Sequence, residues 1–298
     1  MEKQWRSLEY GNARGFLVIA YPRRTVFYQP SGEGLLLSMR LELSTPGGGV
    51  KLTSLLRYVD GYLRIAEHPD YPTAMNGLQV EGPSEIERLC VAVDASEAAI
   101  DAALHRSAQL LVVHHGMFWD GSRPVTGRRY RKLAKLIRGD LGLLSVHLPL
   151  DSHPEIGNCV LLARALGVAL KGRFGAYSGM PIGWWGESDT TRVELCARAE
   201  AVLDGPVRAI EAGPERVLRI GVVTGAGAFV EEAAELQLDT IVTGEGTHHA
   251  AIDAAEFGVN VLYGGHYATE TFGVRALGEH LEERFRLAQE FLHLPTGT

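Results

Sequence analysis

The sequence predicts an α/β protein whose two halves repeat one pattern of strands and helices. Short apolar strands alternate with helical segments, which is typical of βαβ units and a largely parallel sheet. Shifted by 130 residues, the stretch 90–116 lies over the stretch 220–246 without a gap. In both halves an apolar run then leads to a His-x-x-x-acid element, HLPLD (147–151) or HYATE (266–270). Such a repeat indicates a duplicated unit, although unrelated βαβ units also resemble each other because apolar strands look alike.

The elements of the first half follow the chain in order. Apolar residues at helical spacing predict a helix over 52–66. A buried strand over 88–96 leads into a helix over 97–108. Two further strands are predicted at 109–116, which ends at a pair of histidines, and at 142–151.

The domain organisation is expected to be an extension followed by one two-lobed domain. Residues 1–46 show no helical period, run into the linker STPGGG, and form an extension whose order the sequence leaves open. Met39 precedes this linker and offers an alternative start site. The domain over 47–298 is expected to comprise a first lobe at about 50–165, a second at about 215–298, and a connection through 166–214.

Composition and charge exclude several classes of protein. Hydrophobic residues make up 46% and charged residues 22% of the 298, as in soluble globular proteins, and the net charge of −7 argues against nucleic acid as a partner. The three cysteines form no CxxC pair, so we expect neither disulfides nor a thiolate metal site, and a reducing cytoplasm fits. No apolar run reaches the roughly 18–20 residues of a membrane span, and no cleaved signal is expected.

Histidines and carboxylates cluster where the predicted strands end. His114 and His115 end one strand, and the two His-x-x-x-acid elements follow two others. In open α/β sheets ligands bind at this edge. Because imidazole and carboxylate together suit divalent transition metals, the pattern predicts a metal site.

The geometry of the motifs sets limits on the ligands. Adjacent side chains on a strand point to opposite faces, so His114 and His115 could share one metal only if the strand ends there; at a bend they could serve one metal each. His266 and Glu270 share a helix face if a helix begins at His266. Proline in HLPLD excludes a regular helix, so we expect Asp151 to be a ligand reached from a loop.

His147 is expected to contact the metal ligands without binding the metal itself. Other polar residues are expected to line the site. Glu245, His248 and His249 lie at the matching strand end of the second half. They could orient ligands, carry protons or contact substrate. The glycines of TGAGAF (224–229) lack the third glycine of a dinucleotide loop and the Lys-Ser/Thr of a P-loop, so a tight turn beside the metals is favoured over nucleotide binding.

Five motifs occur in an order that resembles a known family. They are NGLQVEG (76–82), HHGMFW (114–119), SVHLPLD (145–151), TGEGTHH (243–249) and GGHYATE (264–270). The chain is similar over about 52–295 to the Nif-three-like dinuclear metal-centre proteins, the GTP cyclohydrolase 1 type 2 homologues, in their shorter version. The usual acidic residue ahead of Asn76 is lacking.

The resemblance implies two intertwined, pseudo-duplicated α/β lobes with mixed, largely parallel sheets, and a toroidal homohexamer. It implies two divalent metal ions per chain held by His114, His115, Asp151, His266 and Glu270, with Glu270 bridging. Zn, Fe, Mn and Co all suit these ligands.

Two classes of function remain open. Open coordination positions would let the metals ionise water, so the chain could hydrolyse a small-molecule substrate as a cyclohydrolase or phosphoesterase. The alternative is a non-enzymatic metal-binding scaffold, chaperone-like ring or regulatory protein. The amphipathic helix expected at 271–291 could serve a ring interface or pack on its own sheet.

Overall fold

The computed structural model describes residues 17–21, 24–28, 49–119, 121 and 123–297. It divides into two units, residues 1–43 and 44–298. In the first unit, β1 (Leu17–Tyr21) pairs antiparallel with β2 (Arg24–Tyr28), so the extension holds strands that the sequence analysis did not expect. Met39 and the linker up to residue 48 lie outside the described residues.

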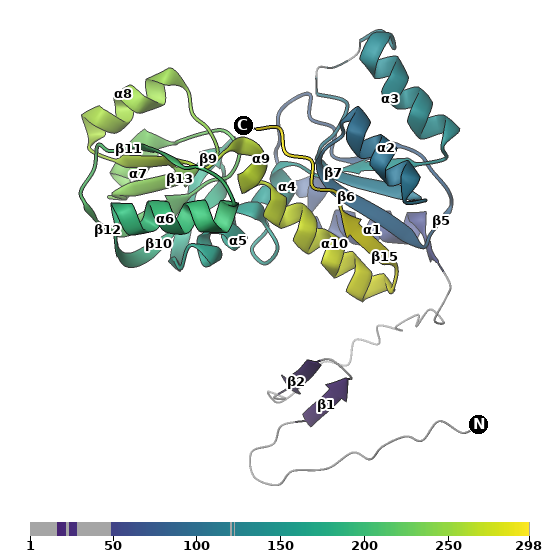
Figure 1. Cartoon of the computed structure of the whole chain (residues 1–298), viewed down its shortest axis with the longest axis horizontal. Coiled ribbons are helices and arrows are strands. Elements are labelled where there is room, and N and C mark those ends of the chain that lie inside the picture. The colour runs from purple at the N-terminus through teal and green to yellow at the C-terminus, as the bar shows by residue number, and fades with distance from the viewer. Residues whose placement is uncertain (1–16, 22–23, 29–48, 120, 122, 298) are drawn as a thin grey trace. The chain divides into compact units, whose positions relative to one another are not determined.

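The second unit contains one large sheet in each of two lobes (Figure 1). The first lobe has the strand order β15-β6-β7-β8-β4. The pairs β15·β6, β6·β7 and β7·β8 are parallel, and β4 runs antiparallel to β8. The strands are β4 (Gly77–Val80), β6 (Arg88–Asp94), β7 (Leu110–His115), β8 (Gly142–Ser145) and β15 (Ala288–Phe291).

The sheet of the second lobe has the order β11-β14-β13-β12-β10-β9. Its central strands β12, β13 and β14 are parallel, and the outer strands are antiparallel to their neighbours. The strands are β9 (Ala169–Tyr177), β10 (Met180–Thr191), β11 (Arg208–Ile210), β12 (Arg216–Val222), β13 (Thr240–Thr243) and β14 (Asn260–Tyr263).

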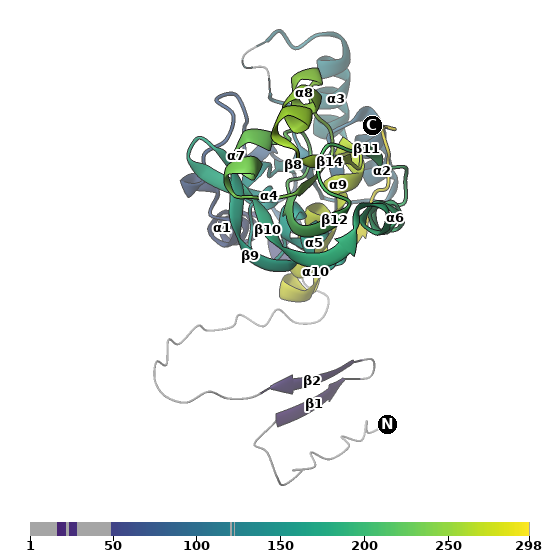
Figure 2. The same cartoon turned by 90° about the vertical axis from the view of Figure 1, so that its left-hand side faces the viewer.

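Helices connect and cover these strands (Figures 1 and 2). In chain order, the helices up to residue 203 are α1 (Leu52–Leu63), α2 (Glu97–His105), α3 (Gly127–Arg138), α4 (Leu148–Asp151), α5 (Asn158–Ala165) and α6 (Arg192–Leu203). The later ones are α7 (Val230–Glu235), α8 (His248–Phe257), α9 (His266–Thr269) and α10 (Thr271–Phe285). A 3₁₀ turn, η1 (Ile65–Glu67), follows α1, and β3 (Val50–Lys51) pairs with β5 (Glu85–Ile86). Within the described part of the chain no helix meets the length and apolarity of a membrane span.

The predicted duplication is visible in the order of the elements. The unit β6–α2–β7 of the first lobe corresponds to β12–α7–β13 of the second, and parallel strands β8 and β14 follow. A short helix then comes after each, α4 and α9 respectively. The α/β fold with two related lobes and mixed sheets is thereby confirmed.

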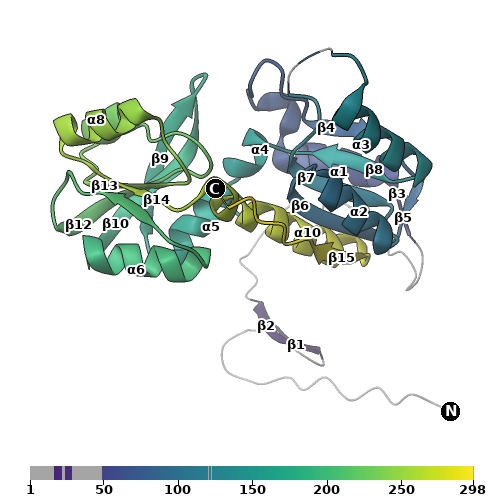
Figure 3. The same ribbon diagram turned by 45° about the horizontal axis from the view of Figure 1, so that its top comes forward.

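The lobes divide the chain differently from the expected bounds. The stretch 166–214, expected to be a connection, supplies β9, β10 and β11 and therefore forms part of the second sheet. The stretch after Glu270 returns to the first lobe, where α10 packs and β15 pairs with β6 (Figure 3). The last helix ends at Phe285, earlier than expected, because Arg286 adopts a left-handed backbone with φ of 57°.

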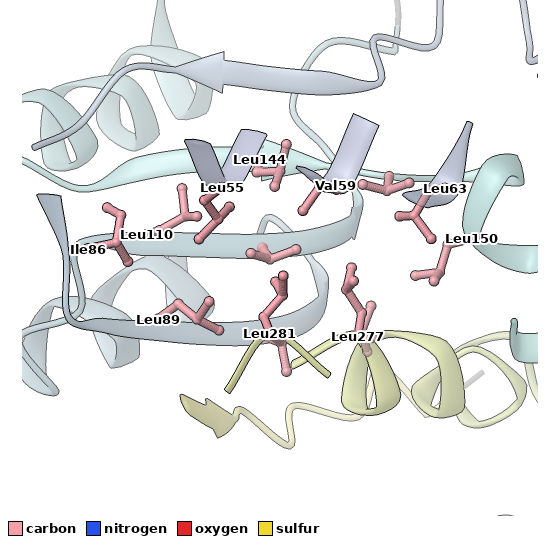
Figure 4. Close-up of a cluster of buried hydrophobic side chains, with 14 of the residues drawn as sticks. Leu55, Val59, Leu63, Ile86, Leu89, Leu110, Leu144, Leu150, Leu277 and Leu281 are labelled. Carbon is pink, nitrogen blue, oxygen red and sulfur yellow. The ribbon is translucent and has the colours of Figure 1, made fainter. Parts of the chain in front are cut away.

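The core of the first lobe holds α10 in place. Leu277 and Leu281 of α10 meet Leu55 and Val59 of α1 over the strand residue Leu89, and all five are buried (Figure 4). Each such leucine contributes roughly 1.5–3 kcal/mol by burial. The apolar stripe of α10 thus packs on its own sheet, and this contact ties Glu270, which directly precedes α10, to the first lobe.

Candidate metal centre

The candidate site lies where strands of both lobes end. β7 ends at His115, β8 leads into α4, and β14 leads into α9. These ends surround a cavity of about 250 Å³. Its lining combines the polar residues His115, His147, Asp151, His266 and Glu270 with the aromatic residues Tyr71, Trp119, Tyr177 and Phe229.

Glu270 is the central residue of the cluster. Its Oε1 lies 3.5 Å from Nε2 of His114. Its Oε2 lies 3.3 Å from Nε2 of His115 and 3.2 Å from Nε2 of His266. The side chain is 2% exposed, so one buried carboxylate faces three imidazoles with both of its oxygens. The i,i+4 placement of His266 and Glu270 on one face, expected from the sequence, is confirmed.

His114 and His115 face different partners. The strand ends at His115, and the two rings lie 4.7 Å apart between centroids. His114 can share a metal ion with Asp151 and Glu270, whereas His115 can share one with His266 and Glu270. The geometry therefore allows one metal for each histidine, and a third group of His114, His115 and His147 also allows a shared metal.

The fully buried ring of His114 has one nitrogen without a partner. Its Nδ1 donates to the carbonyl of Val146 at 2.9 Å. Its Nε2 lies 3.4 Å from Oδ2 of Asp151, yet makes no hydrogen bond, and Oε2 of Glu270 likewise has none. Buried polar atoms are normally hydrogen-bonded, so these two unsatisfied atoms fit a site whose metal ions would supply their missing partners.

Carboxylates orient the other imidazoles through Nδ1. Asp94 accepts from Nδ1 of His115 at 2.9 Å, and Glu245 accepts from Nδ1 of His266 at 2.8 Å. In each ring Nε2 is left facing the cluster. This carboxylate–histidine arrangement is the usual support of metal-ligating histidines. This bond of Glu245 fits an orienting role, one of the three roles left open for it by the sequence. Asp94, a polar residue at a strand end, was missed although its position resembles that of the histidines.

His147 is itself a candidate metal ligand, which differs from the supporting position expected for it. One of its ring nitrogens comes within 4.8 Å of those of His114 and His115. Its Nδ1 donates to Asp70 at 2.8 Å, so Nε2 is the atom free for a metal. Asp70 also accepts from the side chain of Asn76 at 2.8 Å, so an acidic residue six positions ahead of Asn76 contacts it, although the residue directly before Asn76 is Met75.

The HLPLD motif forms a helical turn instead of the expected loop. α4 spans Leu148–Asp151, and Pro149 is tolerated because it occupies the first turn, where backbone N–H groups need no helical partner. Oδ1 of Asp151 accepts from Asn158 at 2.8 Å and from Thr224 at 3.1 Å. These bonds leave Oδ2 directed at His114.

The TGAGAF glycines form the turn expected beside the metals. Gly225 has φ of 66°, and a Cβ there would overlap Oε1 of Glu270. Only glycine permits this approach. By contrast, His248 and His249 are exposed at the start of α8 and belong to none of the metal-capable groups found among the described residues. The expectation that they line the site is not met within this chain.

The cluster shifts the pKa values of its members in opposite directions. Burial lowers the pKa of His114, but the charges of Asp151 and Glu270 outweigh it and raise that pKa well above its usual value. Burial raises the pKa of Glu270, but His114 outweighs it and the pKa lies well below normal. The carboxylate of Glu270, 3.2 Å from its Nε2, raises the pKa of His266 to about 9. In the metal-free chain, protons on His114 and His266 therefore supply the positive charge that a metal ion would otherwise supply to the carboxylates.

Fold and site together define a class: two-lobed α/β proteins with a histidine–carboxylate cluster able to hold metal ions. Residues 50–295 match the family described as Duf34/NIF3 (NGG1p interacting factor 3). The chain belongs to this family.

Curated relatives are similar over most of their length. A "GTP cyclohydrolase 1 type 2 homolog" of Deinococcus radiodurans is 39% identical over 257 residues, covering 85% of this chain and 97% of the relative. Homologues of the same name from Pyrococcus horikoshii and Halobacterium salinarum are 41% and 42% identical, covering 82% and 81% of this chain and 98% and 96% of theirs.

Solved structures share the fold. The protein ybgI, described as of unknown function, superposes with a TM-score of 0.79 at 37% identity, over 84% of this chain and 100% of its own. A protein of Thermus thermophilus gives a TM-score of 0.74 at 37% identity with the same coverage.

Proposed function

We propose that this chain binds two divalent metal ions around Glu270 and activates water there to hydrolyse a small-molecule substrate. The observation that carries this proposal is the placement of Glu270, whose two oxygens face His114 on one side and His115 and His266 on the other. A carboxylate so placed can bridge two ions. His114, Asp151 and Glu270 would hold one, and His115, His266 and Glu270 the other, with His147 beside both histidines of β7.

When bound, two divalent ions would supply Lewis-acid chemistry and lower the pKa of water for attack on a carbon or phosphorus centre. The protein's own residues prepare the site for that role. Asp94 and Glu245 keep a proton on Nδ1 of their histidines and so leave Nε2 unprotonated for a ligand bond once metal is present. Imidazole and carboxylate ligands suit Zn, Fe, Mn or Co.

The cavity walls fit a small organic substrate. Tyr71, Trp119 and Phe229 present flat apolar surfaces beside the polar cluster. Burial raises the pKa of Tyr71, so its hydroxyl stays neutral and can donate a hydrogen bond. Of the described residues that line this cavity none is lysine or arginine, so negative charge on a substrate would be met here by the metals.

Metal analysis followed by a substrate screen tests the proposal. Protein purified without added metal should carry about two ions per chain, and Glu270→Gln, which keeps the size but removes the charge, should carry almost none. His293→Gln, at an exposed position outside the cluster, is the matched control. Metal-dependent hydrolysis of GTP, of other nucleotides or of simple phosphoesters should vanish with Glu270→Gln.

The outcomes separate the two classes of function. A wild-type chain without metal would contradict the proposal entirely. Full metal content with no hydrolysis of any compound would instead favour the alternative, a metal-holding scaffold or regulatory protein. We also propose, on the resemblance of the motifs, that the chain assembles as a homohexamer, and, on its cysteine usage, that it resides in the cytoplasm.

A further inference from the structure

A second cavity, of about 270 Å³, adjoins the metal cavity. The loop after β7 lines it with Gly116, Met117 and Trp119, and α3 lines it with Arg128, Arg129 and Lys132. Trp119 belongs to the lining of both cavities. Its ring lies 4.6 Å from that of His147 and 5.7 Å from that of His115, so this side chain lies between the basic cavity and the candidate ligands.

The loop that carries Trp119 is held firmly. Gln79 of the NGLQVEG motif accepts from the backbone N–H of Met117 at 2.7 Å, and Nε1 of Trp119 donates to the carbonyl of Gly116 at 2.8 Å. A Cβ on Gly116 would overlap the Gln79 side chain. These contacts give a structural role to the NGLQVEG motif, which the metal cluster itself does not explain.

The cavity is strongly positive although the chain is acidic overall. α3 carries six basic residues in its 12 and no acidic residue, in a chain of net charge −7. Two of these are neutralised by the neighbouring helix: Arg131 binds Glu97 at 2.8 Å and Lys135 binds Asp101 at 2.6 Å. Of the cations that line the cavity, Arg128 and Lys132 form no ion pair with a carboxylate of the described residues.

Arg128 and Lys132 are the cations best placed for a ligand. Lys132 donates to the carbonyl of Ala95 at 2.6 Å, a bond that orients it without neutralising it. Arg128 is exposed and has no carboxylate partner among the described residues. The N-terminus of α3 begins beside these cations at Gly127, its cap residue Thr126 makes no side-chain capping bond, and the helix dipole there favours an anion.

We propose that this cavity is an anion subsite that holds a phosphate group of the substrate while the adjoining metals act on another atom of it. The inference rests on the proposed function of the metal centre, and it narrows the substrate to phosphate-bearing small molecules. Arginine and lysine pair with phosphate through charge-assisted hydrogen bonds. The two linings differ accordingly: among the described residues, the metal cavity has no lysine or arginine, and the basic cavity has no metal-capable cluster.

Calorimetric titration of the full metal-loaded chain with inorganic phosphate tests this inference. Arg128→Gln should weaken phosphate binding about tenfold, and Arg128→Lys should keep most of the affinity. Arg138→Gln is the matched control, because Arg138 is exposed on the same helix but lines a different cavity. It should change the affinity less than about twofold.

Each result decides the matter. Equal weakening by Arg128→Gln and Arg138→Gln would overturn the inference in favour of diffuse attraction to a basic helix. No weakening by either would mean that the metals alone hold phosphate, and would also overturn it. Metal content, measured on the same samples, keeps the two proposals apart: normal content with no Arg128 effect refutes only the subsite. An Arg128 effect in a chain that retains no metal would refute the proposed function and leave the anion site.

Discussion

Nδ1 of His147 lies 2.8 Å from Oδ1 of Asp70, although the two residues are 77 positions apart. The same carboxylate accepts from the backbone N–H of Leu148 at 3.1 Å. Asp70 thus fixes both the imidazole and the start of α4, the turn that ends in Asp151. One carboxylate outside the metal cluster therefore positions two of its members.

Asp70→Asn should lower metal affinity about 10–100-fold, because the imidazole loses the charged acceptor that orients it. Competition with a chelator of known affinity measures the effect. Asp101→Asn is the control, since Asp101 is a half-exposed acid paired with Lys135 away from the site. If both variants bound metal like the wild type, Asp70 would have no positioning role.

The two metal subsites should be separable by substitution. Asp151→Asn disables the group with His114, whereas His266→Gln disables the group with His115. Each variant should retain about one ion per chain, because the other group keeps its own ligands. Elemental analysis of dialysed protein gives the ratio. Loss of both ions from each variant would show one inseparable centre, and loss of none would remove both residues from it.

Gly225→Ala should abolish metal binding while leaving the chain folded. The new Cβ would overlap Oε1 of Glu270 and would push that carboxylate out of place. Gly179→Ala controls for backbone strain, because Gly179 also has a positive φ, of 82°, but open space around its Cβ position. Metal content and thermal melting should separate them: both variants lose some stability, but only Gly225→Ala loses metal.

Metal binding should release protons at neutral pH. In the metal-free chain the pKa of His114 lies well above its usual value and that of His266 is about 9, so both rings carry an extra proton at pH 7. A metal needs the unprotonated Nε2, so the apparent affinity should rise with pH until about pH 9. Proton release in weakly buffered solution measures this, and His266→Gln should release about one proton fewer. An affinity independent of pH across this range would contradict the assignment.

The raised pKa of His266 also affects the metal-free fold. A raised folded-state pKa gives stability that is complete below the unfolded value of about 6.5 and is lost as the pH passes 9. Metal-free protein should accordingly melt at a lower temperature at high pH than at neutral pH, and metal should remove much of this difference.

The proposed hexamer is tested by light scattering on dilute protein at moderate salt. A homohexamer should give a mass near six times the 32.4 kDa of the chain. A mass near the monomer would contradict the ring. Because the stripe of α10 is already buried in the first lobe, substitutions there should affect folding before assembly.

The sequence by itself determined the features that depend on neighbouring residues. The apolar runs before His114, His147 and His266 identify buried strands. A histidine that directly follows such a strand must lie at the edge of the sheet where the strands end. The spacing of His266 and Glu270 places them on one helix face. These features follow from backbone geometry within a few residues, and the structure brings the five expected ligands together.

Tertiary structure alone decided which distant residue supports each ligand and where each lobe ends. Nothing near Asp70 in the sequence indicates that it reaches His147, because that contact depends on how the loop before β4 packs over α4. His248 and His249 share the strand-end pattern, yet they begin α8 and turn outward. α10 returns to the first lobe because its leucines pack with those of α1 in the core of that lobe. Local periodicity specifies an element and its buried face, but the packing of whole elements decides which faces meet.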